Sequence, residues 1–242
     1  MLYAALACLA SLLPSVCLAQ IGESLPRFGI QVNAGTLGAG IQAATAVARK
    51  SNVRFGFNYF SYSGSTTSSK DNITYNGTLK LESGEILFDQ YIAGGFHISP
   101  GVAIYDGNQA TGTASIPTGQ TFTLNSVQYY SSASSPVTGT GSFTAGKVAP
   151  ELLIGFGNLL PRGTRHFTVN FDMGVIFTRS PLIKLNLVGN ACTVNSTVGC
   201  VPISSTPSVQ ANLVAEQTKL NNDVGPYLKY WPVIRLGFGY KF

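Results

Sequence analysis

The two residues best placed for catalysis are His97 and Ser99, which are separated only by Ile98. Successive side chains of a β-strand point to opposite faces, so a strand here would carry both on one face. A histidine beside a serine can act as general base for a nucleophilic hydroxyl group. If this strand belongs to a barrel, both side chains point into its interior near one end. We therefore expect His97 to be a hydrogen-bonding residue of the interior, and we assign no catalytic residue.

Four charged residues alternate with large apolar residues in apparent strands. They are Arg54, Glu151, Asp172 and Arg235. If these strands cross a membrane, a Lys or Arg on the lipid-facing surface at mid-depth would cost roughly 2–4 kcal/mol, so the charges belong inside. With His97 they would form either a buried ion-pair network that fixes the strand register or a gate along a narrow polar path. Both interpretations stay open.

Cys192 and Cys200 are the only cysteines after residue 20, and seven residues lie between them. In an exported chain this spacing favours a disulfide that closes a loop. A metal site would need more ligands nearby, and the surrounding sequence offers none. We expect no cofactor.

The last sixteen residues, 227–242, show the clearest strand pattern. Large apolar residues alternate with charged residues or glycine, and the chain ends on Phe242. A strand of this kind shows one face to lipid and the other to a polar or crowded interior. Seven further runs have related patterns, one of them with a bulge expected at Glu82–Glu85; they begin near residues 28, 37, 53, 79, 96, 148 and 167. The sequence therefore predicts an all-β fold, an eight-stranded antiparallel transmembrane β-barrel.

The connections between these runs alternate in length. Short turns are expected at 49–52, 91–94 and 160–164, and long loops at about 63–76, 106–146 and 180–226. Bacterial barrels have short periplasmic turns and longer outer loops, so this order puts the long segments outside the cell. We expect a hairpin near 121–130 and a short helix at 213–223 within the long segments.

The N-terminal segment predicts export. Residues 2–19 carry no charge and end on Cys17-Leu18-Ala19, so we interpret 1–19 as a signal peptide and 20–242 as a single barrel domain. After residue 20 the sequence has no stretch of 18 apolar residues, which leaves a barrel as the way to cross a bilayer. The net charge of +5 comes without a cluster of Lys or Arg, and nucleic-acid binding has little support.

The chain resembles small outer-membrane β-barrel proteins of Gram-negative bacteria, broadly the eight-stranded OmpW and OmpA-like barrels. The resemblance rests on segments spread over most of the mature chain, namely 34–38, 94–101, 147–150, the 191–200 loop and 215–220 before the closing strand. It implies an outer-membrane location and, for the OmpW-like proteins, passage of small, rather hydrophobic molecules. The His97 and Ser99 pair is similar to part of the lipid A deacylase arrangement, but here it would lie near the periplasmic end.

Three functions follow in order of preference. The first is a narrow pore for small or hydrophobic solutes. The alternative is a structural or surface-interaction, adhesin-like barrel with a plugged interior, and a lipid-modifying enzyme is a distant third. The expected partners are outer-membrane lipid and lipopolysaccharide, the barrel-assembly machinery through Phe242, and an extracellular partner through the loops.

Overall fold

The computed structural model describes residues 28–242 except 70–71, 106–108, 145, 180–181 and 194–198. The first strands are β1 (Gly29–Gly35), β2 (Gly38–Ala48), β3 (Ser51–Thr67), β4 (Thr74–Ala93) and β5 (Phe96–Tyr105). Four shorter strands follow: β6 (Gln109–Ser115), β7 (Thr121–Leu124), β8 (Val127–Ser131) and β9 (Thr138–Thr144). The remaining strands are β10 (Val148–Phe156), β11 (Phe167–Phe177), β12 (Leu182–Val188), β13 (Asn190–Thr193), β14 (Val201–Pro202) and β15 (Tyr230–Lys241). Helix α2 (Pro207–Val224) lies between the short 3₁₀ helices η1 (Ile203–Ser205) and η2 (Tyr227–Lys229).

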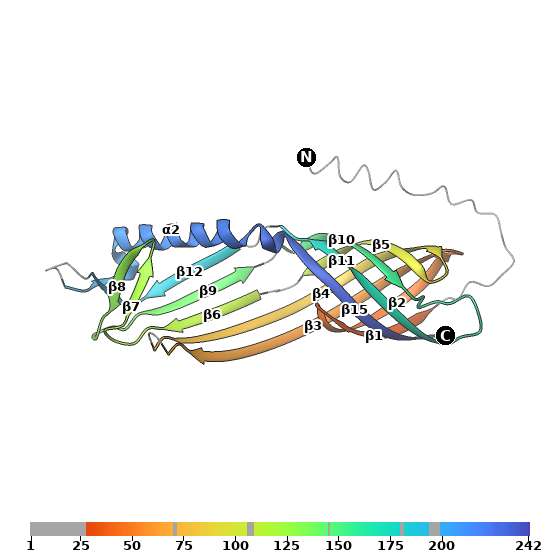
Figure 1. The fold of residues 1–242 in the computed structure, drawn as a ribbon, viewed down its shortest axis with the longest axis horizontal. Helices are drawn as coiled ribbons and strands as arrows, with labels where there is room; N and C mark the ends of the chain where they lie inside the picture. The colour runs from red at the N-terminus through yellow and green to blue at the C-terminus, as the bar shows by residue number, and fades with distance from the viewer. Residues whose placement is uncertain (1–27, 70–71, 106–108, 145, 180–181, 194–198) are drawn as a thin grey trace.

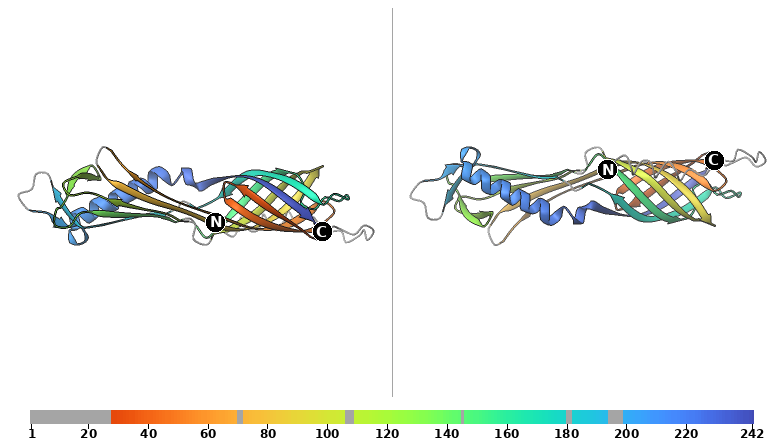
Figure 2. Two further views of the ribbon diagram at one scale, coloured as in Figure 1. Left: turned by 90° about the horizontal axis from the view of Figure 1, so that it is seen from below. Right: turned by 90° about the horizontal axis from the view of Figure 1, so that it is seen from above.

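One set of strands closes on itself. Each strand pairs antiparallel with the next in the order β4, β3, β2, β1, β15, β11, β10, β5, and β4 also pairs with β5. The first and last strands of the chain meet in this arrangement, with Gly29 opposite Lys241. We call this closed set of strands the ring; of β3 and β4 it includes only the part up to the point where β4 stops pairing with β5. The ring forms the right-hand part of Figure 1, and Figure 2 shows it from two further sides.

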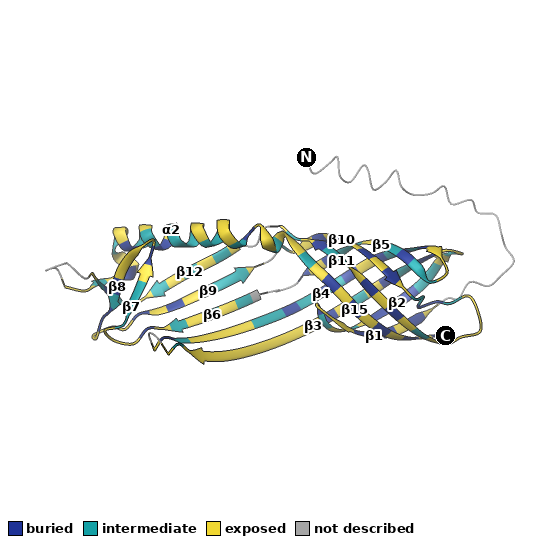
Figure 3. Cartoon of the chain, in the orientation of Figure 1, coloured by how far each residue is buried: buried dark blue, intermediate teal, exposed yellow. Residues whose placement is uncertain are grey.

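Side chains in the ring alternate between the interior and the outside. β10 has alternating exposed and buried residues along its whole length, and β15 does so from Pro232 onward. This alternation appears in Figure 3 as dark and yellow bands along the strands. The exposed set is apolar, for example Phe55, Leu236 and Phe238, whereas many buried residues are polar or charged. The period of two used to predict these strands is therefore present in the structure.

Beyond the ring, β3 and β4 continue as a long hairpin that carries a second sheet region. The β3–β4 register runs without interruption from Ser51 opposite Gln90 to Thr67 opposite Thr74. The bulge expected at Glu82–Glu85 is not present in this pairing; the register of β4 shifts instead between Tyr91 and Ala93, where it pairs with β5. As a result Leu87 faces inward and is 1% exposed, instead of returning to the outer face.

The distal part of the hairpin is the edge of a five-stranded region, in the order β3, β4, β6, β9, β12. A smaller sheet of β7, β8, β13 and β14 packs at its far end, and α2 runs alongside β12 (Figure 1). Their shared core contains Ile73, Tyr129, Val137, Ile203 and Leu213. We call these strands and α2 together the extension.

The segments expected as long loops thus hold much of the extension. The 106–146 segment contains β6 to β9, and the 180–226 segment contains β12 to β14 and α2. The hairpin expected near 121–130 is present as β7 and β8, and the expected helix is longer than 213–223. The disulfide between Cys192 and Cys200 is confirmed.

Residues 1–19, interpreted as a signal peptide, lie outside the described residues. Among the described residues, no helix combines the length and the apolar character that a membrane span requires.

Candidate functional site: the charged cluster inside the ring

A cluster of charged side chains occupies the middle of the ring. β3 contributes Arg54, β5 His97, β11 Asp172 and β15 Arg235, each from an inward-facing position and each at most 3% exposed. These are four of the five residues that the sequence placed in the interior. Burial of so many charges is unfavourable unless they pair with one another and are hydrogen-bonded.

Two ion pairs in the cluster join opposite strands of the ring. Arg54 Nη1 lies 2.8 Å from Asp172 Oδ2, and Arg235 Nη1 lies 2.5 Å from Glu85 Oε2. Three strands separate β3 from β11 on either side, and the same holds for β15 and β4. Arg235 Nη2 also contacts Asp172 Oδ2 at 3.1 Å, which connects the two pairs. The cluster therefore crosses the interior in two directions.

His97 and Ser99 belong to this cluster but bind different carboxylates. The His97 Nε2 atom lies 2.9 Å from Asp172 Oδ1, and its Nδ1 atom lies 3.1 Å from the carbonyl oxygen of Gly95. Ser99 donates its hydroxyl proton to Asp89 Oδ1 over 2.6 Å. In this geometry the serine hydroxyl is directed to a carboxylate and not to the imidazole, so His97 and Ser99 do not form a base and nucleophile pair.

Side-chain amides extend the cluster toward the neighbouring strands. Asn58 donates to Glu85 Oε1 over 2.6 Å, and Gln42 donates to Glu85 Oε2 over 3.2 Å. Gln31 donates to Gln42 and accepts a hydrogen bond of 2.7 Å from Asn170. Asn58 thus binds the Glu85 oxygen that Arg235 does not contact, and the other amides link with one another, as a buried polar network requires.

Glu151 is the expected member that lies apart from the cluster. It is 3% exposed, and neither carboxylate oxygen has a hydrogen-bond partner among the described residues. It is paired across the sheet with Gly101 and Ile176, beside an apolar layer that includes Leu87, Leu153 and Val233. Glu151 is thus inside the ring, but it forms none of the ion pairs described for the network.

Glu85 and Asp89 are the two carboxylates that the sequence analysis missed. Asp89 lies 2.8 Å from Arg54, and Glu85 pairs with Arg235. The expected bulge obscured them, because it interrupted the alternation of β4. Without a bulge, the sequence Glu85-Ile86-Leu87-Phe88-Asp89 puts both acids on one face and Ile86 and Phe88 on the other.

Packed side chains close the interior on both sides of the cluster. Toward the extension lies an apolar layer that includes Ala103, Ile176 and Val233, each at most 1% exposed. Toward the other end, Leu159 and Leu160 pack with Ala44, and both leucines are at most 1% exposed. The charged cluster is therefore enclosed between two apolar layers.

No group of three or more His, Cys, Asp or Glu residues in the described part of the chain has the arrangement of a metal site. The carboxylates of the cluster are instead engaged by Arg54 and Arg235. The cluster is thus organised as an ion-pair network.

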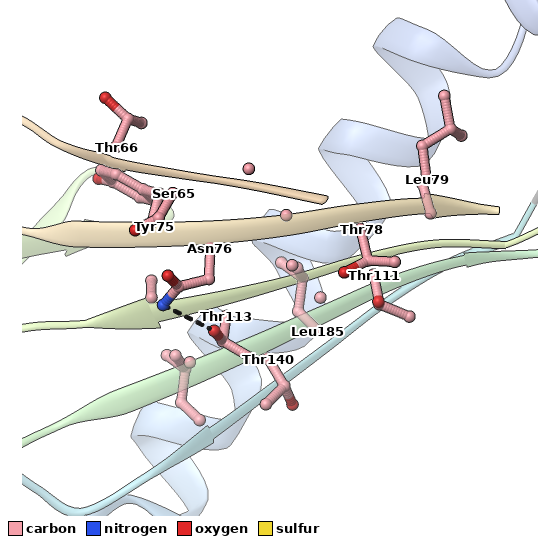
Figure 4. Close-up of a pocket in the computed structure, with 18 of the residues that line it drawn as sticks. Ser65, Thr66, Tyr75, Asn76, Thr78, Leu79, Thr111, Thr113, Thr140 and Leu185 are labelled. Atoms are coloured by element: carbon pink, nitrogen blue, oxygen red, sulfur yellow. Dashed lines mark hydrogen bonds between the residues drawn. The ribbon is translucent and has the colours of Figure 1, made fainter. Parts of the chain in front are cut away.

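A separate cavity of about 760 Å³ lies in the extension. Its lining comes from β3, β4, β6, β9 and β12, with Leu124 of β7 and Leu213 of α2 (Figure 4). None of the charged residues of the ring contributes to it, since the lining consists of Gly, Ala, Leu, Ser, Thr, Tyr and Asn.

These features define a class of protein: an antiparallel sheet that closes on itself around a filled, charged interior and continues into a folded extension. No protein-family model matches the chain, and no curated protein matches it. Its structure is similar to the crystal structure of Acinetobacter baumannii CarO, with 21% identity, 88% of this chain and 97% of that chain covered, and a TM-score of 0.54. It is also similar to A. baumannii CarO2, with 17% identity, coverage of 91% and 100%, and a TM-score of 0.56. At these identities the likeness concerns the fold alone, and the narrower resemblance to OmpW and OmpA stays a prediction.

Proposed function

We propose that the chain is a Gram-negative outer-membrane protein whose ring is an eight-stranded transmembrane barrel with a closed interior, and that it acts at the cell surface through the extension. The observation that carries this proposal is the pair of salt bridges between opposite strands, Arg54 with Asp172 and Arg235 with Glu85. Side chains joined in this way occupy the centre of a small barrel, whose interior is only wide enough for side chains to fill.

The outer surface of the ring supports the membrane location. Large apolar side chains cover it on successive strands, including Val32, Ile41, Phe57, Ile154 and Leu236, which are 41–63% exposed. A continuous apolar belt of this kind is unfavourable in water and suits the hydrocarbon region of a bilayer. The fold shared with the two CarO structures supports the same placement.

Lipid contacts and assembly follow from this proposal. The aromatic residues Phe28, Phe167, Tyr240 and Phe242 gather at the end of the ring away from the extension, and Phe28 stacks on Phe242 with ring centres 5.8 Å apart. Aromatic side chains are favoured at the membrane–water interface. We propose that this end faces the periplasm, that Phe242 contributes to recognition by the barrel-assembly machinery, and that lipopolysaccharide surrounds the opposite end.

The second candidate is a narrow gated pore. It is favoured by the polar side chains that line the middle of the ring. Gln31, Gln42, Asn58 and Asn170 line the interior around the ion pairs. Conduction would require both cross-interior salt bridges to separate and the apolar layers to open.

Single-channel recording separates the two candidates. The full-length mature protein, refolded so that it migrates faster on an unheated gel, is inserted into a planar bilayer. The closed-interior proposal expects no discrete conductance from the wild type, and none from Arg54→Ala combined with Arg235→Ala as long as the apolar layers stay packed. Steady, reproducible steps from the wild type would establish the pore instead.

A further inference from the structure

The cavity in the extension has an unusual floor, made by four glycines that are paired directly across neighbouring strands. Gly64 of β3 lies opposite Gly77 of β4, Gly77 opposite Gly112 of β6, and Gly112 opposite Gly141 of β9. Adjacent strands are about 4.8 Å apart, so the row exposes bare backbone over roughly 14 Å. Leu185 of β12 lies opposite Gly141 as the next residue of the row, and its side chain bounds the glycine floor at this end.

Neither packing nor backbone conformation explains these glycines. A Cβ atom added at Gly77 would meet nothing within 4 Å, and at Gly112 its nearest neighbour would be 3.7 Å away. None of the four is among the glycines with positive φ. Glycine in the interior of a strand weakens it, and it often marks a place where a ligand approaches the backbone closely.

The side chains around the row determine the chemistry of the cavity. In register, Tyr62 and Tyr75 lie on the same face as the row, on opposite sides of the Gly64 and Gly77 pair, and they are 66% and 43% exposed. Leu79, Leu185 and Leu213 also line the cavity. The lining contains no Asp, Glu, Lys, Arg or His, so it offers no partner to a charged ligand.

Uncharged polar residues of the same strands also belong to the cavity lining. Thr78, Thr111, Thr113 and Thr140 occupy positions next to the glycines of the row, and Asn76 donates to Thr113 over 3.4 Å (Figure 4). The cavity therefore combines apolar surface with neutral hydrogen-bonding groups.

We propose that this cavity binds a small, uncharged, planar ring compound, which lies flat on the glycine row and contacts the rings of Tyr62 and Tyr75. A planar ring matches a floor without side chains, and aromatic contacts with tyrosine favour it further. The volume of about 760 Å³ is within the range of small-molecule sites. This inference rests on the proposed placement of the extension outside the membrane, where a solute from the medium can reach it.

The test uses indole, a neutral, planar and water-soluble probe, with the full-length mature protein in lipid nanodiscs. Saturation-transfer NMR reports binding of indole, and empty nanodiscs give the signal due to lipid. The wild type is expected to show a saturable signal. Gly77→Val, which puts a side chain on the floor where there is open space, is expected to weaken binding by about tenfold or more.

The matched control is Gly84→Val in the same strand. Gly84 also has open space, with the nearest atoms 3.9 Å from an added Cβ, but it does not line the cavity. Valine is favoured in strands, so both variants are expected to fold, as the unheated gel will verify. Tyr62→Ala is expected to weaken binding and Tyr62→Phe to retain it, because the ring and not the hydroxyl group makes the contact.

Three results would overturn the inference: no saturable signal from folded wild type, equal loss of binding in Gly84→Val, or self-association of the wild type that Gly77→Val abolishes. The last result, measured by sedimentation, would assign the cavity to a second copy of the chain. Conductance of the wild type would contradict the closed interior but leave the indole result interpretable, so the two proposals fail separately.

Discussion

Arg54 shows how a buried charge is held in this protein. Its guanidinium group contacts Asp89 on the neighbouring strand and Asp172 on the opposite strand, each at 2.8 Å, and its side chain is 2% exposed. Removal of the arginine would leave two buried carboxylates without one of their cations. Such a loss is more costly than the net contribution of the pair itself.

Arg54→Ala is therefore expected to lower the free energy of unfolding by about 3–5 kcal/mol. The measurement is the urea concentration at which half of the fast-migrating form on an unheated gel is lost. Lys80→Ala is the control, because the Lys80 and Glu82 pair, at 2.9 Å, is 45% and 28% exposed and is expected to contribute less than about 1 kcal/mol. Equal shifts in the two variants would contradict a buried network.

Gly155 makes room for the same cluster. A Cβ atom at this position would collide with Asp172 Oδ1 and with the His97 ring. Gly155→Ala is expected to destabilise the protein by about 1–3 kcal/mol through this crowding. The same urea titration tests it, and Gly84→Ala, which meets no close neighbour, should change stability by less than about 0.5 kcal/mol. A neutral Gly155→Ala would mean that the cluster rearranges freely.

At the scale of elements, α2 protects an edge of the extension. The Gln217 side-chain oxygen accepts the backbone N–H of Leu185 over 3.0 Å, and Asn221 accepts the N–H of Ile183 over 2.9 Å and donates to its carbonyl over 3.0 Å. Val209 and Leu213 precede these residues at intervals of four, so one face of the helix carries both apolar and amide contacts. An edge strand covered in this way is shielded from pairing with other chains.

Replacing Gln217 and Asn221 together with alanine is expected to speed amide hydrogen exchange at Leu185 and Ile183 by roughly 2- to 10-fold, because each N–H loses its acceptor. Exchange followed by mass spectrometry or NMR gives the rates. Thr218→Ala is the matched helix variant, since the Thr218 hydroxyl group donates to the carbonyl of Val214 in its own helix. Faster exchange in that variant as well would point to general loosening of α2.

The sequence predicted the ring strands better than the extension, for a physical reason. Strands such as β10 and β15 carry large apolar residues on the outer face, whereas their inward positions are mostly small or charged residues, so the two faces differ clearly. In β6 and β9 the alternation is between threonine or serine and glycine or alanine, which contrasts little. Those strands are held by their pairing with β4 and β12, and a sequence pattern does not reveal such pairing.

At the scale of the whole molecule, the outside of the ring and the outside of the extension should differ in their tolerance of charge. Leu236→Arg on the ring is expected to destabilise the folded protein in lipid vesicles by about 2–4 kcal/mol. Leu182→Arg on the extension, where Leu182 is also exposed, at 51%, should have little effect. Urea titration in vesicles measures both, and equal tolerance would contradict the membrane placement of the ring.

Some features of the candidate site could be predicted from the sequence, and others are visible only in the structure. Period-two alternation placed Arg54, His97, Asp172, Arg235 and Glu151 on inward faces, and the structure has all five buried. It did not reveal which acid pairs with which arginine. Glu85 takes the place in the network that was expected of Glu151, because closure of the ring brings β4 opposite β15 and leaves Glu151 beside an apolar layer.

By itself the sequence determined most strands of the ring, the inward face of Arg54, His97, Glu151, Asp172 and Arg235, and the pairing of Cys192 with Cys200. These are local properties, set by side-chain alternation and by short separation along the chain. Only the tertiary structure decided that salt bridges join opposite strands, that β3 and β4 carry a folded extension, and that four glycines align into one floor. Each of these depends on which strands pair and in what register, and these strands are distant in sequence. The side-chain pattern of a single strand does not specify its partner.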